Sequence, residues 1–194
     1  MITALRSFTS LYSTTFMMVL AAGLLTTYLG LRLNTMDVAP LWIGAMMSAY
    51  YVGLMFGSKV GHKLIAQVGH IRAFVACAGI VTACAIAHAL IDDLTIWLVL
   101  RVAVGMGMMC QYMVLESWLN EQSEPNQRGT VFASYMIASY LGLMAGQAAI
   151  SLYPELGLEP LLLIAMFFAL CIVPIAITSS IHPAPLTPAP LNMR

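Results

Sequence analysis

Charged residues are scarce in this sequence. Only 8% of the 194 residues are charged, whereas 61% are hydrophobic, and the mean hydropathy is +0.89. A soluble domain of ordinary composition carries about 25% charged residues, which coat the surface that faces water. The composition therefore predicts a membrane protein rather than a soluble domain, with the lipid bilayer as its first partner.

The sequence also lacks a charge excess and the short motifs of common enzymes. Its formal net charge is +0, so nucleic-acid binding has no electrostatic support. It contains no phosphate-binding loop, no G-x-S-x-G and no H-E-x-x-H, which argues against an enzyme. Its four cysteines show no C-x-x-C or Cys/His spacing, so they are predicted to be small buried hydrophobes. We therefore predict neither a metal site nor a cofactor.

Long apolar runs dominate what is present. A helix needs about 20 mainly apolar residues to cross a bilayer, and the runs lack the alternation that marks β-strands. The fold class predicted is an all-α, polytopic membrane protein with a six-helix bundle in residues 1–180. A Pro-rich tail or linker, 181–194, follows the bundle. The six predicted spans are approximately residues 10–31, 40–60, 73–91, 94–115, 130–153 and 160–179.

The basic residues predict the orientation. Cytoplasmic loops of membrane proteins are enriched in Lys and Arg. If the six spans alternate in direction, Arg32 is the only basic residue of the loops on one side of the membrane. Five acidic residues of the loops lie on that same side. Both termini are therefore predicted to be cytoplasmic, in the cytoplasmic membrane of a bacterium. The residues on the basic side are Arg6, Lys59, Lys63, Arg72, Arg128 and Arg194.

Residues 57–72, GSKVGHKLIAQVGHIR, form the densest basic segment. We interpret it as a cytoplasmic loop that gates the inner face, with Gly57, Gly61, Lys63, Gly69, His70 and Arg72 as its gate residues. Glycine also recurs at every fourth position at Gly53, Gly57 and Gly61. This spacing predicts close approach of another helix, either as static packing or as an interface that slides during transport.

Arg101 stands inside an otherwise apolar run, followed by Gly105 and Gly107. An arginine at the centre of a bilayer costs about 2.5–3.5 kcal/mol, so we favour a functional side chain facing the bundle interior over one that snorkels to the interface. Glu116 marks the inner end of the same helix. It either pairs with a base of residues 57–72 and latches the inner face, or it is solvated.

Polar side chains within the spans are candidates for lining a transport cavity, although bonding across helices is the alternative for each. They are Thr27, Tyr51, Gln111, Tyr112, Tyr135 and Ser139. Met109 and Met113, with Cys110 between them, offer soft ligands for Cu(I), but methionine is also a common filler of apolar interiors.

Two of these patterns resemble motifs of the major facilitator superfamily. The span-four pattern R-x-x-x-G-x-G is present at Arg101, Gly105 and Gly107. The loop motif G-x-x-x-D-R-x-G-R-R is matched loosely, by Gly61, Gly69, His70 and Arg72. One extra residue separates the two glycines, and Ile65 or Ala66 stands at the Asp position. The antiporter pattern of span five is half present, with Gly142 and Gly146 followed by Gln147 rather than Pro, so antiport is not indicated.

The segments ESWLNEQ and LGLRL look like a bacterial branch near the sugar- and drug-efflux members. The resemblance implies secondary active transport of a small organic solute by alternating access, with Arg101, Gly105, Gly107 and Glu116 in conformational coupling and protons as a further partner. The family fold has two six-helix halves, and this chain resembles the N-terminal one.

Three arrangements would account for the single half. The chain is a fragment or truncated product, it forms a homodimer, or it pairs with a separately encoded second half. Rival readings are a membrane assembly partner or decayed half that transports nothing, and a copper carrier.

Overall fold

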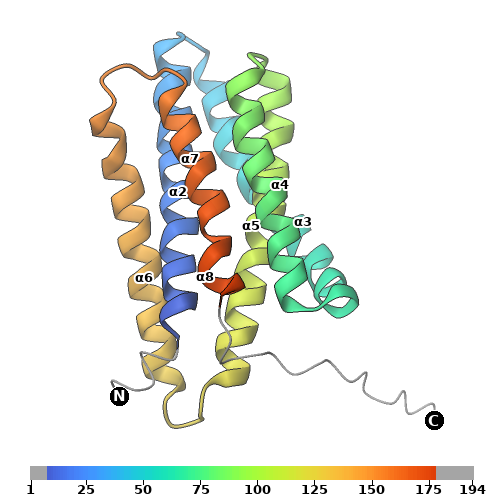
Figure 1. Ribbon diagram of the computed structural model, residues 1–194. Coiled ribbons are helices and arrows are strands. Elements are labelled where there is room, and N and C mark those ends of the chain that lie inside the picture. The colour runs from blue at the N-terminus through green and yellow to red at the C-terminus, as the bar shows by residue number, and fades with distance from the viewer. Residues whose placement is uncertain (1–7, 178–194) are drawn as a thin grey trace, which may run out of the picture.

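The computed structural model describes residues 8–177, which form a bundle of long helices (Figure 1). Its first five helices are α2 (Thr9–Thr35), α3 (Pro40–Val68), α4 (His70–Leu90), α5 (Leu94–Gln122) and α6 (Arg128–Ala149). A 3₁₀ turn, η1 (Ile150–Leu152), extends α6, and α7 (Glu159–Leu170) with α8 (Ile172–Ala176) makes the last crossing.

Six segments of this bundle are long and apolar enough to cross a membrane. The predicted fold class, an all-α bundle with six spans, is therefore confirmed. Arg6, Arg194 and the Pro-rich tail 181–194 lie outside the described residues.

Local sequence signals explain several helix ends. Pro40 occupies the first turn of α3, where its missing N–H costs nothing. The Asp93 carboxylate caps α5 by accepting a hydrogen bond from the backbone N–H of Ile96 at 2.9 Å. Gly69, with φ of 82°, stands between α3 and α4, in a region of backbone space that favours glycine.

The basic segment 57–72 is not the loop that was predicted. Helix α3 continues through it to Val68, and α4 begins at His70, so Gly69 alone separates the two helices. Lys59 and Lys63 are exposed on the last turns of α3, where charged side chains reach water without breaking a helix. Helix α3 therefore extends past the predicted span as an amphipathic end. Helix α5 does the same and continues to Gln122.

The bundle is organised around α2 and α5, whose central residues supply much of the buried core. Helix α3 packs along α5, and α6 packs along α2. On the other side α4 contacts α5 and α7, and α7 contacts α2 (Figure 1). Both glycine-rich contacts involve the outer helices α3 and α6, which are the least buried spans.

Glycines explain how closely these pairs approach. A Cβ placed on Gly53 of α3 would lie closer than 3.0 Å to Val102 O and to Gly105 Cα of α5. A Cβ on Gly142 of α6 would lie 2.6 Å from Phe16 O of α2. Any larger residue would push these backbones apart, so the predicted close approach of another helix at the α3 glycines is confirmed.

The turns gather at two opposite ends of the bundle. We call one the basic end: it holds the start of α2, the α3–α4 junction and the α5–α6 turn, with Lys59, Lys63, Arg72 and Arg128. The other, the acidic end, holds the α2–α3, α4–α5 and α6–α7 connections. Its charged residues are Arg32, Asp37, Asp92, Asp93, Glu155 and Glu159.

Candidate functional site

Arg101 is buried inside the bundle, with 1% of its surface exposed. Its Nη2 donates a hydrogen bond to Thr26 Oγ1 of α2 at 3.3 Å, and its guanidinium carbon lies 4.9 Å from the ring centroid of Tyr50 on α3. The Nε–H has no hydrogen-bond partner among residues 8–177. The side chain therefore faces the interior and does not snorkel to the nearby acidic end.

No carboxylate within the described residues forms an ion pair with Arg101. A buried charge is costly unless it is paired with an opposite charge. The face of an aromatic ring gives a guanidinium less electrostatic stabilisation than a carboxylate would. Arg101 thus places an incompletely compensated positive charge where α2, α3 and α5 meet.

The two glycines that follow Arg101 contact different helices. A Cβ on Gly105 would lie closer than 3.0 Å to Tyr50 O, and 3.0 Å from Gly53 Cα, so this glycine admits α3. A Cβ on Gly107 would lie 2.5 Å from Val81 Cγ2, so that glycine admits α4. The R-x-x-x-G-x-G pattern therefore sets the packing of α5 against both neighbours, and the Gly105 contact brings Tyr50 to the guanidinium.

A cavity of about 630 Å³ opens at the basic end, between α3, α4, α5 and α6. Of the predicted site residues it brings together His70 and Glu116. Met109 and Met113 also line it. The complete lining is Ser58, His62, Ile65, Ala66, His70, Met109, Met113, Glu116, Ser117, Asn120 and Phe132.

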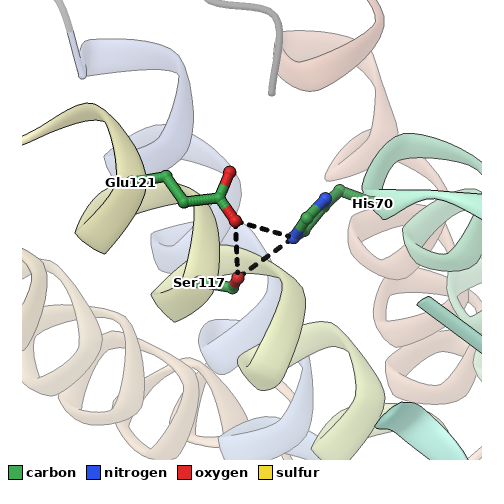
Figure 2. Close-up of polar contacts among 3 residues, drawn as sticks. All are labelled: His70, Ser117 and Glu121. Atoms are coloured by element: carbon green, nitrogen blue, oxygen red, sulfur yellow. Dashed lines mark hydrogen bonds and ion pairs between the residues drawn. The ribbon is translucent and has the colours of Figure 1, made fainter. Parts of the chain in front are cut away.

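His70 links α4 to α5 at this cavity (Figure 2). The ring is buried, and its Nε2 lies 3.0 Å from Ser117 Oγ and 3.7 Å from Glu121 Oε1. Ser117 donates to the same Glu121 oxygen at 3.3 Å. The consistent arrangement has His70 Nε2–H donating to Ser117 and Ser117 donating to Glu121.

The His70, Ser117 and Glu121 arrangement is a structural link between helices, not hydrolytic machinery. In a Ser-His-acid triad the carboxylate holds the imidazole nitrogen opposite the serine. Here Glu121 and Ser117 lie on the same ring nitrogen, as Figure 2 shows.

Glu116 has a partner different from the one predicted. Its Oε1 accepts a hydrogen bond from the Tyr135 hydroxyl of α6 at 3.1 Å, which ties α5 to α6. Within the described residues, the ion pair at the basic end joins His70 to Glu121 rather than to Glu116. The predicted pairing of Glu116 with a base of residues 57–72 is therefore wrong for the described residues, in which Glu121 pairs with His70 instead.

The remaining predicted gate residues are spread along α3 and α4. Gly57 and Gly61 are buried against α5 and serve helix packing rather than a loop. Lys63 and Arg72 are exposed at the basic end, and Gly69 is the hinge between the helices.

The predicted cavity-lining residues have varied surroundings. Gln111 is fully buried and faces the last span, with its Nε2 4.0 Å from Cys171 Sγ. Its Oε1 has no hydrogen-bond partner in the described part of the chain. Tyr51 is 65% exposed on the outside of α3. Thr27 and Ser139 bond to carbonyls of their own helices, at Gly23 and Tyr135. Tyr112 contacts the Tyr50 hydroxyl, which places it near the Arg101 cluster.

Sequence reasoning missed the partners of the predicted residues. Thr26 and Tyr50 complete the Arg101 cluster, while Ser117 and Glu121 complete the His70 cluster. For Ser117 and Glu121 a signal was present, because positions four apart on a helix share a face. Thr26 and Tyr50 come from helices far from Arg101 in sequence, and only the packing brings them together.

Comparison with known proteins agrees with this architecture. The family model described as Major Facilitator Superfamily matches residues 4–192. An uncharacterized MFS-type transporter of Enterobacter sp. (strain 638) is 30% identical over 155 residues, which cover 75% of this chain and 40% of that protein. The uncharacterized MFS-type transporter YcaD of Escherichia fergusonii is 28% identical over 152 residues, or 73% of this chain and 39% of the relative.

The chain thus spans about two fifths of the length of the curated relatives that it matches. Six apolar helices, a buried arginine followed by two packing glycines, and a family match over almost the whole sequence are mutually consistent. The chain therefore belongs to the Major Facilitator Superfamily of membrane transporters.

Proposed function

We propose that this chain is the N-terminal six-helix half of a secondary active transporter that moves a small organic solute by alternating access. Family membership supports transport in general. The coverage of two fifths of the relatives supports a half-size unit, and the family architecture binds substrate between two such halves. The ESWLNEQ segment favours a bacterial branch near the sugar- and drug-efflux members.

The orientation that we propose places the basic end in the cytoplasm. Four basic residues within the described range lie there, against Arg32 alone at the acidic end. The excess of Lys and Arg on one side follows the positive-inside rule. Both termini are then cytoplasmic, in a bacterial inner membrane.

Arg101 is the observation that carries the transport proposal. A charged side chain within a membrane span costs free energy, and such side chains typically mark functional sites. Because no carboxylate within the described residues compensates it, a negative charge supplied from elsewhere during the cycle has a favourable site. That charge belongs either to the solute or to a group of the second half, and its arrival would bias the contact between α2, α3 and α5.

The basic end supplies the gate in this proposal. His70, Ser117 and Glu121 hold α4 to α5, while Tyr135 and Glu116 hold α6 to α5. These contacts border the cavity of about 630 Å³. Breaking one set would let α4 or α6 tilt relative to α5 and change access from the cytoplasm. Glu116, which lines this cavity, is the proposed proton-responsive group.

Transport in proteoliposomes tests the proposal. The purified chain is reconstituted, and uptake of radiolabelled hexoses and efflux of ethidium are followed under an imposed pH gradient. We expect Arg101→Ala to abolish transport, and Arg128→Ala, which alters an exposed arginine at the basic end, to retain it. Equal activity of the two variants would remove the role given to Arg101, and no movement of any probe by the intact chain would reject transport by the chain alone.

The second candidate is a membrane assembly partner that transports nothing. Disulfide cross-linking separates the two. A cysteine at Met144, which is 64% exposed on α6, should trap a homodimer or a second six-helix partner in native membranes if a transporter is assembled. A chain that stays monomeric under these conditions contradicts an assembled transporter.

A further inference from the structure

Sulfur-containing residues of α5 line two separate cavities. Met109 and Met113 line the polar cavity at the basic end, together with His70 and Glu116. Cys110, which lies between them in sequence, lines a separate cavity with Met106, one turn earlier on the same face. The soft-ligand trio suggested by the sequence, Met109, Cys110 and Met113, is therefore divided between two sites.

The second cavity brings in a cysteine from another helix. Cys77 of α4 lines it together with Cys110 of α5. Both residues are buried, with 5% and 3% of their surfaces exposed, and both are free thiols. Two cysteines and Met106 thus border one space of about 170 Å³.

The chemistry of the walls restricts what this space can bind. Apart from the three sulfur residues, its lining is glycine and aliphatic: Gly57, Val60, Gly61, Leu64, Ile80, Ala103 and Gly107. Hard cations such as Mg²⁺ and Ca²⁺ require oxygen ligands, which these side chains do not offer. The described residues also hold no group of three His, Cys, Asp or Glu that would suit a Zn²⁺ site.

The cavity lies beside close helix contacts. Gly57, Gly61 and Gly107 are among its lining residues, and they are the positions at which α5 packs closely against α3 and α4. Val60 and Ile80 line it and are 49% and 53% exposed, which places the cavity at the outer surface of the bundle.

We propose that Cys77, Cys110 and Met106 form a binding site for a soft monovalent metal ion of the Cu(I) class. Thiolate and thioether sulfur select Cu(I) among the biological metals. Binding exchanges one thiol proton for one Cu(I), so a thiolate, a thiol and a thioether hold the ion and the site stays neutral. This balance suits an apolar cavity, where a net charge would be costly, and it needs no change of oxidation state.

Titration of the full chain tests this site. The chain is purified in detergent and kept reduced and anaerobic, and Cu(I) is supplied in competition with the chromophoric chelator bicinchoninate. We expect one Cu(I) per chain. Cys77→Ser and Cys110→Ser should each weaken binding by about 100-fold or more, beyond the roughly 10–100-fold that loss of an outer-shell partner costs. Because Cys84→Ser alters a buried cysteine that does not line this cavity, it should bind as the unaltered chain does.

Two methionine variants locate the site. Met106→Leu should weaken binding, whereas Met109→Leu should not, since Met109 lines the other cavity. The opposite result would assign Cu(I) to the basic-end cavity and overturn the proposal, as would an equal effect of Cys77→Ser and Cys84→Ser or an absence of binding.

X-ray absorption of the loaded, unaltered chain gives an answer that does not depend on how well the variants fold. A first coordination shell of sulfur alone is expected, and nitrogen or oxygen ligands would contradict the site. Transport is not the readout in either experiment, so the metal site and the transport proposal can fail separately.

Discussion

The contact between α3 and α5 leaves no room for a side chain at Gly57. A Cβ there would lie 2.7 Å from Met106 O, 2.8 Å from Met109 Cβ and 2.9 Å from Met106 Cα, all of which belong to α5. Ordinary van der Waals contact begins at 3.4 Å. Because none of these atoms is the end of a flexible side chain, Gly57→Ala should force the two helices apart locally by about 0.7 Å, the step from 2.7 to 3.4 Å.

The expected cost follows from two opposing effects. Overpacking of a well-packed contact typically destabilises by about 1–3 kcal/mol. Replacing a helical glycine by alanine gains about 1 kcal/mol from helix propensity. Gly44→Ala provides a matched control on the same helix, because a Cβ at Gly44 meets nothing within 4 Å. The propensity gain cancels between the two variants, so Gly57→Ala should be less stable than Gly44→Ala by about 1–3 kcal/mol.

Thermal unfolding in detergent, followed with a thiol-reactive fluorophore, measures this difference. The assay suits this chain because Cys77, Cys84, Cys110 and Cys171 are all buried and react only on unfolding. If the two variants unfold at the same temperature, or Gly57→Ala unfolds later, then the close approach of α3 to α5 is not as described. Transport that fails at temperatures where Gly57→Ala remains folded would favour a sliding interface over static packing.

Three further substitutions test the polar contacts. Arg101→Leu should leave the free energy of unfolding unchanged or raise it by about 1–4 kcal/mol, because replacing buried charged groups by apolar ones often does so. Transport in proteoliposomes should be lost. Marked destabilisation would contradict the view that the Arg101 charge is incompletely compensated. Glu121→Gln should change the free energy of unfolding by no more than about 1 kcal/mol, because its pair with His70 is partly exposed, and a larger loss in denaturant titration would show a stronger link than the geometry implies. Tyr135→Phe removes the hydrogen bond to Glu116 and should lower the free energy of unfolding by about 1.5–3 kcal/mol at most in the same titration. Cysteine labelling at the basic end should become faster. An unchanged labelling rate would argue against a link between α5 and α6.

The sequence was sufficient for the number and type of spans, because lipid imposes a simple rule. A backbone that crosses hydrocarbon must satisfy its own hydrogen bonds, so runs of about 20 apolar residues become helices. The same rule stops at the membrane surface. It did not predict that α3 would continue to Val68, because Lys59 and Lys63 sit on its exposed side and are as compatible with a helix as with a loop.

Functional residues were predictable where a single residue contradicts its surroundings. Arg101 is conspicuous as the basic residue within an apolar run, and its burial was predicted correctly. Its contacts with Thr26 and Tyr50 were not, because they depend on how three helices meet. Gln111 shows the same limit: its sequence position suggests a cavity wall, whereas the rotation of α5 directs it toward Cys171.

Position around the helix axis also determines which cavity each sulfur-containing residue of α5 lines. Residues one apart on a helix point about 100° from each other, so Met109 and Cys110 cannot share a narrow site unless neighbouring helices surround both. The structure places α4 against the Cys110 face and leaves Met109 and Met113 to the basic-end cavity. Spacing along one helix therefore grouped three sulfur-containing residues that the structure divides between two cavities.

The exposed surfaces of α3 and α6 bear on how a single bundle functions. In lipid, an exposed leucine or methionine is unremarkable, because acyl chains are as apolar as those side chains. Polar groups within a span are different, and Tyr51 of α3 and Tyr140 of α6 are 65% and 59% exposed well inside their helices. Hydroxyl groups at that depth need a partner or water. A second bundle lying across α3 and α6, with an aqueous cavity between the two, would supply both. The least buried helices of this chain are therefore the expected contact with the second half of the proposed transporter.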